Sequence, residues 1–275
     1  MKSSYYKYFA ALLLFGSNGI VASNINLPSY EIVLLRLLLG SLFLITVFTV
    51  SRQRFTFYRN KHTCLYLFIS ASAMGASWML LYEAYQQVGI SIASLAYYCG
   101  PVIVMILSPF LFRETLTWPK IAGFLTVLAG MCLVNLQALD EGKTIWGLFC
   151  GLMSAFMYAL MVTANKKAKP ESGLENSLLQ LVIGSFIVVA FVSMQKNFVL
   201  SLTTIDWIPV LLLGLLNTGI GCYLYFSSIT DLPVQTVAIC GYLEPLSAVV
   251  FSVLFLHEVL LPLQMLGAVL ILGGA

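Results

Sequence analysis

Three ionisable side chains lie inside long apolar stretches of the sequence, and they are the residues best placed to do chemistry. They are Arg36, Glu83 and Glu244. A charge inside an apolar helix costs about 3 kcal/mol or more unless it faces a partner, water or a ligand. Each of the three is therefore a candidate for binding a substrate.

Glu244 lies at a depth of its apolar stretch where the sequence supplies no lysine or arginine. Its carboxylate must therefore be protonated, bound to a cationic ligand or reached by water. This predicts an ion- or substrate-sensing group in a central cavity, where protonation alternates with occupancy by a cationic substrate. Arg36 and Glu83 share a depth on one side of the membrane, so two interpretations stay open for them: a structural ion pair, or substrate binding.

Two prolines lie near the middle of apolar stretches, at Pro101 and Pro245. A proline inside a helix leaves the carbonyl four residues earlier without its donor, which would free the carbonyls of Tyr97 and Gly241. Irregular backbone at this depth is tolerated where it lines a cavity, so Pro101, Pro245 and Gly241 are candidates for a gating kink. The alternative is a simple packing kink.

Aromatic and amide side chains gather at the same level of the apolar stretches. The aromatic candidates for holding a ligand are Trp78, Tyr82, Tyr97 and Tyr98, and Asn18 and Asn217 add neutral hydrogen-bonding groups. Carboxylates beside tyrosines and a tryptophan suit a substrate with a cationic or aromatic group. The alternative is an ordinary core or an aromatic belt at the membrane surface.

Chemistry of other kinds finds little support in the sequence. The six cysteines form no CxxC or Cys/His cluster, and neither His62 nor His257 lies within a span beside a nucleophile. We therefore expect no catalytic residue, no metal and no cofactor. The net charge of +3 is too small to predict a surface for nucleic acid.

The elements that must position these residues are membrane helices. Hydrophobic residues make up 60% of the chain and charged residues 9%, against about 25% charged in soluble proteins. Since a bilayer needs about 20 apolar residues per helix, the sequence predicts an all-α integral membrane protein with ten transmembrane helices. The predicted spans are 5–23, 30–50, 64–86, 91–112, 119–136, 145–164, 175–194, 207–228, 234–256 and 262–275. The last is short, so we expect the given chain to stop inside its tenth helix.

The chain contains an internal repeat. Pro101, Glu114, Gly123 and Gly130 recur as Pro245, Glu258, Gly267 and Gly274, each after 258 − 114 = 144 positions, and Gly40-Ser41 recurs as Gly184-Ser185 in the same register. This predicts two five-helix halves, residues 1–136 and 137–275. An odd number of spans per half means that the halves enter the membrane in opposite directions. We interpret Glu114 and Glu258 as interfacial caps or charge pairs at helix ends and not as substrate ligands.

Basic residues predict the orientation. With the amino terminus inside the cell, the cytoplasmic segments hold Lys2, Lys7, Arg52, Arg54, Arg59, Lys61, Arg113, Lys120, Lys166, Lys167 and Lys169, whereas the outer loops hold Lys143 and Lys196. Cytoplasmic loops are enriched in lysine and arginine. Both termini are therefore predicted in the cytoplasm, and the protein in the plasma or inner membrane.

These residues resemble the EamA-type members of the drug/metabolite transporter superfamily over essentially the whole chain. The resemblance rests on Pro101, Glu114, Thr117 and Gly123, on their recurrence as Pro245, Glu258 and Gly267, and on Arg36 in the second span. It implies ten helices in two inverted five-helix repeats, with a central cavity walled by the first four helices of each. It also implies transport of amino acids, amines, drugs or other small metabolites, often by export. Glu244 departs from the symmetry, since the first repeat has Gly100 there.

We therefore expect a secondary active transporter of a small amino acid, amine or other amphipathic or cationic compound, with alternating access and proton coupling. The alternative is a passive uniporter or exchanger of an anionic or lipid-like metabolite. A channel would more naturally show rings of like groups from an oligomer. The expected partners are the small-molecule substrate and the lipid bilayer, with the protein a monomer or a homodimer.

Overall fold

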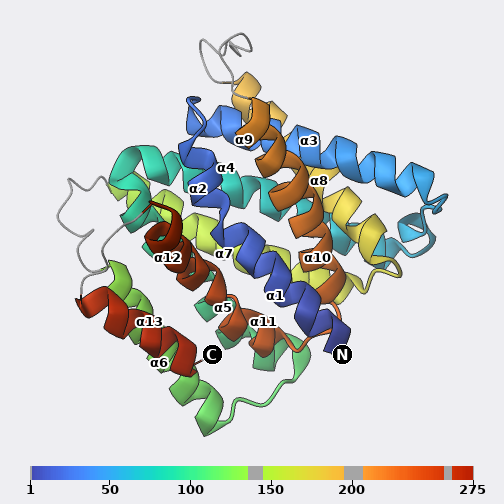
Figure 1. Cartoon of the computed structure of the whole chain (residues 1–275). Coiled ribbons are helices and arrows are strands. Elements are labelled where there is room, and N and C mark those ends of the chain that lie inside the picture. The colour runs from blue at the N-terminus through green and yellow to red at the C-terminus, as the bar shows by residue number, and fades with distance from the viewer. Residues whose placement is uncertain (1, 136–144, 195–206, 257–261, 275) are drawn as a thin grey trace.

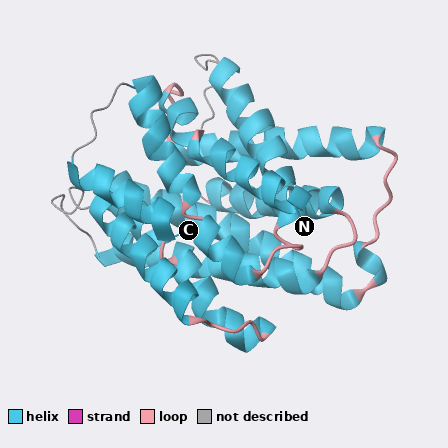
Figure 2. Ribbon diagram, turned by 60° about the horizontal axis from the view of Figure 1, so that its bottom comes forward, coloured by secondary structure: helices cyan, strands magenta, loops and turns pink. Residues whose placement is uncertain are grey.

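The computed structural model describes residues 2–135, 145–194, 207–256 and 262–274. Within these ranges the chain forms helices and loops and no strand (Figure 2). The first half contains α1 (Lys2–Gly16), α2 (Asn18–Ser23), α3 (Ser29–Val50), η1 (Phe57–Arg59), α4 (Lys61–Tyr97), α5 (Gly100–Phe112) and α6 (Trp118–Asn135). The second contains α7 (Ile145–Ala168), α8 (Gly173–Ser193), α9 (Trp207–Leu211), η4 (Leu212–Ile220), α10 (Gly221–Ser228), α11 (Val234–Cys240), α12 (Leu243–Leu256) and α13 (Pro262–Gly274).

Helix occupies each of the ten predicted spans, as far as the described ranges reach. Six helical stretches in these ranges are long and apolar enough to cross a membrane: Tyr30–Val50, Lys61–Val88, Ile145–Ala168, Gly173–Ser193, Trp207–Ser228 and Val234–Phe255. The apolar helix Gly100–Phe112 is shorter. The prediction of an all-helical fold is therefore confirmed.

Helix α4 bends sharply within the region predicted to join two spans. A Cβ atom built on Gly151 of α7 would lie 3.8 Å from the Cβ of Ala84 and 2.8 Å from the Cβ of Ala96. Residues 84 and 96 of a straight helix would lie about 18 Å apart, so the chain reverses between them. The predicted join at 87–90 lies within this reversal, and the stretch long enough to span a membrane ends at Val88, although the chain is helical up to Tyr97.

Helices α4 and α5, and likewise α11 and α12, are separated by short breaks at equivalent places of the repeat. The first break lies at Tyr98-Cys99 and the second at Gly241-Tyr242. Pro101 lies in the first turn of α5, where a proline costs no hydrogen bond. The two prolines therefore follow helix breaks instead of kinking continuous helices.

One of the two carbonyls predicted to be free at these breaks is hydrogen-bonded. The Gly241 carbonyl accepts a hydrogen bond from the Glu244 amide at 3.2 Å, so it is not free as predicted. The Tyr98 carbonyl accepts one from the Tyr242 hydroxyl at 2.8 Å. The Gly241 carbonyl is bonded because its break tightens into a turn, whereas the Tyr98 carbonyl receives its donor from the other break.

Some contacts between the two halves join residues that are counterparts in the repeat. The hydroxyls of Ser41 on α3 and Ser185 on α8 lie 3.0 Å apart, and their separation in sequence is 144. Tyr98 and Tyr242, which share the hydrogen bond across the breaks, have the same separation. Counterparts can meet in this way where a symmetry axis passes between them.

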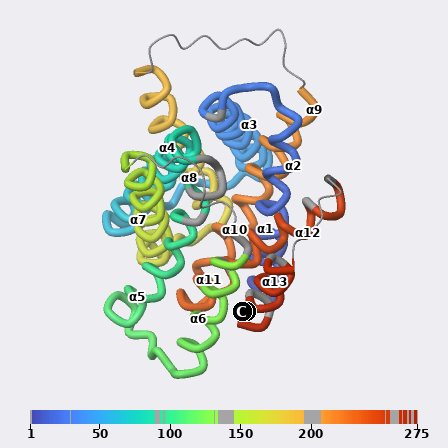
Figure 3. Tube along the Cα trace, turned by 90° about the vertical axis from the view of Figure 1, so that its left-hand side faces the viewer, coloured from blue at the N-terminus to red at the C-terminus, as the bar shows by residue number. Residues whose placement is uncertain are grey.

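Small residues let the halves approach closely at matching positions. A Cβ atom on Gly40 would lie 2.9 Å from Cγ2 of Thr218, and one on its counterpart Gly184 would lie 2.7 Å from Cε of Met74. Met74 and Thr218 are themselves counterparts in the repeat. Helices α6 and α13, the last of each half, also pack against each other at one side of the bundle (Figures 1 and 3).

The main hydrophobic core draws side chains from both halves. Among its fully buried members are Leu37 of α3 and Leu181 of α8, together with Tyr8, Phe226 and Tyr242. The Tyr8 hydroxyl donates to the Val237 carbonyl at 2.7 Å, which satisfies a buried polar group. Helix α1 consequently lies between α10 and α12 of the second half (Figure 1).

Glu114 caps a helix of the opposite half, as predicted for a cap. Its carboxylate accepts hydrogen bonds from the amides of Val234 at 2.8 Å and Gln235 at 3.0 Å, the first residues of α11. A carboxylate at this position satisfies open backbone donors and complements the helix dipole. The predicted counterpart, Glu258, lies outside the described residues.

The close approach of α6 and α13 yields a stability prediction. A Cβ atom on Gly123 would lie 2.6 Å from the carbonyl oxygen of Gly274, whereas one on Gly273 would meet nothing within 4 Å. We expect Gly123→Ala to destabilise the purified protein by about 1–3 kcal/mol because the backbones must separate. Gly273→Ala should leave stability unchanged or raise it by up to about 1 kcal/mol, the helix propensity of alanine. Thermal unfolding in detergent measures both effects. Equal melting temperatures for Gly123→Ala and Gly273→Ala would contradict the close packing of α6 against α13.

Candidate functional site

Arg36 lies in the middle of the bundle, on α3, and only 7% of its surface is exposed. Its Nε atom donates a hydrogen bond to Oγ1 of Thr218 at 2.9 Å. The guanidinium lies over the ring of Trp78, at 4.6 Å from the ring centroid. A cation over a tryptophan face gains about 0.5–2 kcal/mol. The position and tilt of the guanidinium are therefore fixed by α4 and η4.

Thr218 owes its position to an irregular helix. The segment η4 is a π-helix, and the Thr218 hydroxyl donates to the carbonyl of Leu213 at 2.8 Å. Since that donation uses the only hydroxyl hydrogen, the oxygen lone pairs are free to accept from Arg36. Widened helical turns of this type occur frequently at functional sites.

Asn217 and Asn18, both predicted candidates, are joined to each other at the break between α1 and α2. The Asn217 amide donates to the Leu14 carbonyl at 2.8 Å, to the Ser17 hydroxyl at 2.9 Å and to Oδ1 of Asn18 at 3.0 Å. Asn217 is 1% exposed. These contacts satisfy backbone and side-chain groups at the break, so this amide holds α1 and α2 against η4.

Glu244 lies in the first turn of α12 and is half-buried. Its backbone carbonyl accepts from the Ser247 hydroxyl at 2.8 Å, while no residue in the described ranges donates a hydrogen bond to its side-chain carboxylate. The first turn of a helix favours a negative charge. Glu244 is therefore an available acceptor at the start of a broken helix.

Several tyrosines, one cysteine and one guanidinium interact electrostatically with Glu244. The groups that interact with its charge are Tyr8, Tyr85, Tyr97, Tyr98, Tyr158, Cys222 and Arg36. They come from α1, α3, α4, α7 and α10 and from the turn after α4. The structure thus gathers Tyr97, Tyr98, Arg36 and Glu244, four predicted residues, in one region between the halves.

The aromatic rings of this region pack edge to face. Tyr97 and Tyr158 lie 5.5 Å apart between ring centroids, and Tyr82 lies 5.2 Å from Tyr85. The Tyr158 and Tyr225 hydroxyls are 3.3 Å apart. Offset and edge-to-face pairs are the favoured aromatic arrangements. These rings therefore form a fixed wall that offers both apolar surface and hydroxyl groups.

The predicted ion pair between Arg36 and Glu83 is wrong. Glu83 accepts hydrogen bonds from Gln87 at 3.1 Å and from the indole of Trp146 at 3.3 Å. Trp146 is 55% exposed, so this carboxylate lies towards the outside of the bundle. Two residues at the same depth in the membrane can point in different directions around their helices. The sequence gives the depth but not this direction, so the predicted pair does not form.

Sequence reasoning missed Thr218 and Tyr158. Thr218 is an ordinary threonine in an apolar segment, and only its contact with Arg36 gives it a role. Tyr158 lies in the sixth predicted span, and its ring meets Tyr97 through tertiary packing. No signal in a single sequence would have selected Thr218. The spacing of Tyr158 from other aromatics would not have selected it either.

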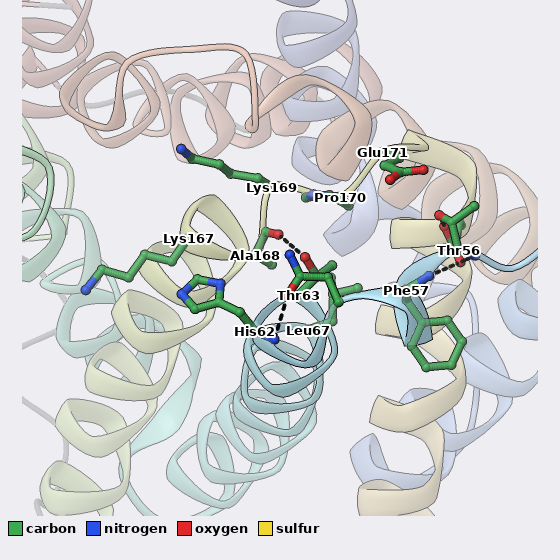
Figure 4. A pocket seen from close by; sticks show the side chains of 12 residues that line it. Thr56, Phe57, His62, Thr63, Leu67, Lys167, Ala168, Lys169, Pro170 and Glu171 are labelled. Carbon is green, nitrogen blue, oxygen red and sulfur yellow. Dashed lines mark hydrogen bonds between the residues drawn. The ribbon is translucent and has the colours of Figure 1, made fainter.

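A separate pocket of about 340 Å³ lies between loops of the two halves (Figure 4). Its lining residues are Thr56, Phe57, Asn60, His62, Thr63, Leu67, Lys167, Ala168, Lys169, Pro170, Glu171 and Glu175. Glu175 accepts from the amides of Thr56 at 2.5 Å and Phe57 at 3.0 Å, and Thr63 donates to the Ala168 carbonyl at 3.0 Å. These contacts join the start of η1 to the first turn of α8, and the start of α4 to the end of α7.

Helices of membrane-spanning length, with charged and hydroxyl side chains between the two halves, are typical of a multi-pass membrane transporter. The chain belongs to the EamA-like transporter family, whose model matches residues 3–136 and again residues 145–275. The family resemblance seen in the sequence is thereby confirmed. The relatives are named as transporters, so the protein is a transporter and not an enzyme.

Similar proteins cover most of the chain. An uncharacterised transporter of Bacillus subtilis, YxxF, is 27% identical over 98% of this chain and 86% of its own length. The threonine/homoserine exporter RhtA of Escherichia coli is 28% identical over 84% of this chain and 75% of its own length. A solved crystal structure at 18% identity has a TM-score of 0.83, over 99% of this chain and 95% of that one, which shows the same fold.

The different partners of Arg36 and Glu83 yield a second prediction. We expect Arg36→Gln and Glu83→Gln to have additive effects on thermal stability, with a coupling below about 0.5 kcal/mol, as for residues without shared contacts. A cycle of Arg36→Gln with Thr218→Val is the control, because those side chains touch and should show coupling. Strong coupling between Arg36 and Glu83 would show that the two side chains do form an ion pair.

Proposed function

We propose that this protein is a secondary active transporter that moves a small amphipathic metabolite with a cationic group by alternating access. The observation that carries the proposal is the Glu244 carboxylate, whose charge acts on Tyr97, Tyr98 and Tyr158 and which receives no hydrogen bond from the described residues. A carboxylate enclosed in a membrane protein without a donor is costly unless a ligand or a proton occupies it. Binding and release of a cation would provide that occupant.

The proposed architecture is ten transmembrane helices in two inverted five-helix repeats, residues 1–136 and 137–275. The double match to the family model supports this division. So do the contacts of Ser41 with Ser185 and of Tyr98 with Tyr242, counterparts that meet between the halves. In inverted repeats the substrate site lies at the interface of the repeats, near the middle of the membrane. In this chain, the region of Arg36 and Glu244 corresponds to that position.

The proposed orientation places both termini in the cytoplasm of a cell whose plasma or inner membrane holds the protein. Segments that the basic residues assign to the cytoplasm come together in space. Ser4 donates to Asp231 at 2.7 Å, and Lys166 donates to the carbonyls of Thr230 and Leu232, both at 2.5 Å. These contacts join the amino terminus, the end of α7 and the loop after α10 at one end of the bundle.

The same end supports alternating access. Glu114 from the first half caps α11 of the second half, and Lys120 donates to Oε1 of Gln235 at 2.6 Å. Gln235 in turn donates to the hydroxyl of Ser108 at 2.9 Å. On the proposed orientation these bonds close the cytoplasmic side. Opening towards the cytoplasm would have to break them, and water would replace them at modest cost.

The proposed substrates are amino acids or amines and the proposed direction is export, which the similarity to a threonine/homoserine exporter supports. A second candidate is a passive carrier of an anionic metabolite, which the buried guanidinium of Arg36 favours. The proposed transporter needs no cofactor and no nucleic acid. It works in a lipid bilayer as a monomer or a homodimer.

The orientation is tested by labelling with a reagent that cannot cross the membrane. In a variant without native cysteines, we expect Lys166→Cys to react from the cytoplasmic side only and Lys143→Cys from the outside only. Lys2→Cys, near the amino terminus, should behave like Lys166→Cys. Labelling of Lys166→Cys and Lys143→Cys from the same side would overturn the proposed topology.

The role of Glu244 is tested by replacing it with glutamine. Besides Glu244, the titratable and charged groups of this region are the side chains of Tyr8, Tyr85, Tyr97, Tyr98, Tyr158, Cys222 and Arg36. Because an amide keeps the shape of the acid but cannot take up a proton, Glu244→Gln should abolish pH-dependent exchange in liposomes without lowering the melting temperature. Glu171→Gln, at an exposed loop, is the matched control. If transport by Glu244→Gln kept the pH dependence of the wild-type protein, Glu244 would have a packing role only.

A further inference from the structure

The pocket between the loops of the two halves lies where helices of membrane-spanning length begin and end. The stretch Lys61–Val88 begins at this pocket, Ile145–Ala168 ends there and Gly173–Ser193 begins beside it. The ends of such helices lie at the level of the lipid headgroups. A ligand of the pocket is therefore a group found at the membrane surface.

The walls of the pocket come from both halves of the chain. Its volume is about 340 Å³, which is within the range of small-molecule sites. The buried residues Leu67 of the first half and Ala168 of the second contribute apolar surface. The hydrogen bond from Thr63 to the Ala168 carbonyl joins these two walls. A ligand in the pocket would consequently contact both halves.

Two cations of the pocket have no anionic partner. Lys167 and Lys169 both line it, and neither ammonium group forms a hydrogen bond or an ion pair within the part of the chain that the structure describes. The Nζ atom of Lys167 lies 6.0 Å from the ring centroid of Tyr66, which is a contact that leaves its N–H groups available. These two ammonium groups are therefore able to bind an anion.

The two acids that line the pocket do not neutralise these lysines. Glu175 is 1% exposed, and its carboxylate accepts hydrogen bonds from the amide and hydroxyl of Thr56 and from the amide of Phe57. Glu171 is exposed and lies on the same side as Thr56 and Phe57, whereas the lysine ammonium groups lie on the other side (Figure 4). The pocket thus has a basic side whose charges the protein does not balance.

The segment before α4 adds further positive charge at this end of the bundle. Residues 51–63 contain no aspartate or glutamate, and their basic residues Arg52, Arg54, Arg59 and Lys61 are all exposed. The helix α4 begins at Lys61, and the start of a helix carries a partial positive charge. The electrostatic environment of the pocket therefore favours an anionic ligand.

The backbone of Lys169 is an independent indication that its side chain has a function. Its φ angle is 47°, in the left-handed region. The residue directly follows α7, at a position where helices commonly have glycine because a side chain is unfavourable there. Residues held in such conformations cluster at ligand-binding sites. A lysine in place of glycine therefore indicates that the ammonium group is needed at the pocket.

The helix faces next to the pocket favour a lipid over a soluble anion. On α4, Leu65 and Phe68 are each 57% exposed, and they follow Lys61 by four and seven residues, which places the three on one face. On α7, Phe156 is 48% exposed and precedes Lys167 by 11 residues, about three full turns. Exposed apolar side chains on membrane-spanning helices contact acyl chains. A lipid headgroup in the pocket would therefore have its chains along these faces.

We propose that this pocket binds the phosphate of an anionic phospholipid, with Lys167 and Lys169 as its cationic ligands and its acyl chains along α4 and α7. Basic pockets between membrane helices are suited to such headgroups. On the proposed orientation the lipid belongs to the cytoplasmic leaflet. The site is independent of the transported substrate, because neither Arg36 nor Glu244 lines it. A headgroup that contacts both halves would hold them together at this end.

The test measures lipid binding to the purified full chain in detergent by the shift of its melting temperature. The probes are dioctanoyl-phosphatidylglycerol, dioctanoyl-phosphatidylcholine and glycerol 3-phosphate, which has a phosphate but no chains. We expect phosphatidylglycerol to raise the melting temperature in a saturable way, because a ligand of the folded state stabilises it. Phosphatidylcholine, whose ammonium cancels the phosphate charge, should bind about 5-fold more weakly or worse. Glycerol 3-phosphate should give no shift at the same concentrations.

Three variants assign the site to the two lysines. Lys167→Gln and Lys169→Gln should each weaken phosphatidylglycerol binding by about 5-fold, the usual contribution of one basic side chain at an anionic membrane. Lys169→Gly should weaken it as much, but should keep or raise the melting temperature without lipid, because glycine accepts the left-handed backbone. Arg113→Gln is the control, since Arg113 is exposed and has a φ angle of 57° but does not line the pocket. It should keep the wild-type affinity.

Each contrary result would overturn a different part of the proposal. Equal affinities for phosphatidylglycerol and phosphatidylcholine would show that acyl chains alone bind. A shift with glycerol 3-phosphate as large as with lipid would make the pocket a site for a soluble phosphate. Wild-type lipid affinity in both Lys167→Gln and Lys169→Gln would remove the site from this pocket, and no shift with any probe would remove it altogether. None of these results would affect the proposed role of Glu244, because none measures transport.

Discussion

The structure depends on keeping two opposite charges apart inside an apolar bundle. Arg36 and Glu244 interact electrostatically, and a direct contact between them would be the simplest way to neutralise both. In the structure Arg36 instead contacts the ring of Trp78 and the hydroxyl of Thr218. A cation–π contact stabilises a guanidinium without using its N–H groups, so the guanidinium is held while its terminal edge stays available.

Irregular helices make this arrangement possible. A π-helix places Thr218 beside Arg36, and the break before α12 places Glu244 in a first turn, where open backbone amides favour a carboxylate. Hydrogen bonds from side chains stabilise the breaks between the helices. Asn217 bonds three acceptors at the break between α1 and α2, and the Tyr242 hydroxyl bonds the Tyr98 carbonyl at the break after α4. In a membrane these bonds are required, because lipid offers none.

The contacts between the halves are of two kinds. In the middle of the bundle, α3 and α8 meet through Ser41 and Ser185, and glycines bring the backbones close. At the ends the contacts are polar, as for Glu114 on α11 and Glu175 on the loop after α3. Polar contacts near water exchange partners at little cost. On the proposed mechanism, the halves would open at their ends while the middle of the bundle holds them together.

The sequence by itself determined the membrane class, the helical fold and the family. These follow from apolar segments of membrane length and from residues that recur at a fixed interval, both of which are local properties of the chain. It also placed Arg36 and Glu244 among the candidates, because a charge in an apolar segment is conspicuous wherever it points.

Only the tertiary structure decided which candidates share a site. Arg36 and Glu83 have a similar depth, but Glu83 turns towards Trp146, and the direction of a side chain around its helix depends on packing that a single sequence does not contain. The contact of Thr218 with Arg36 depends on packing for the same reason, since the π-helix turns this hydroxyl towards Arg36. The prolines marked the breaks, whereas the hydrogen bond from Tyr242 to Tyr98 required both halves to be folded together.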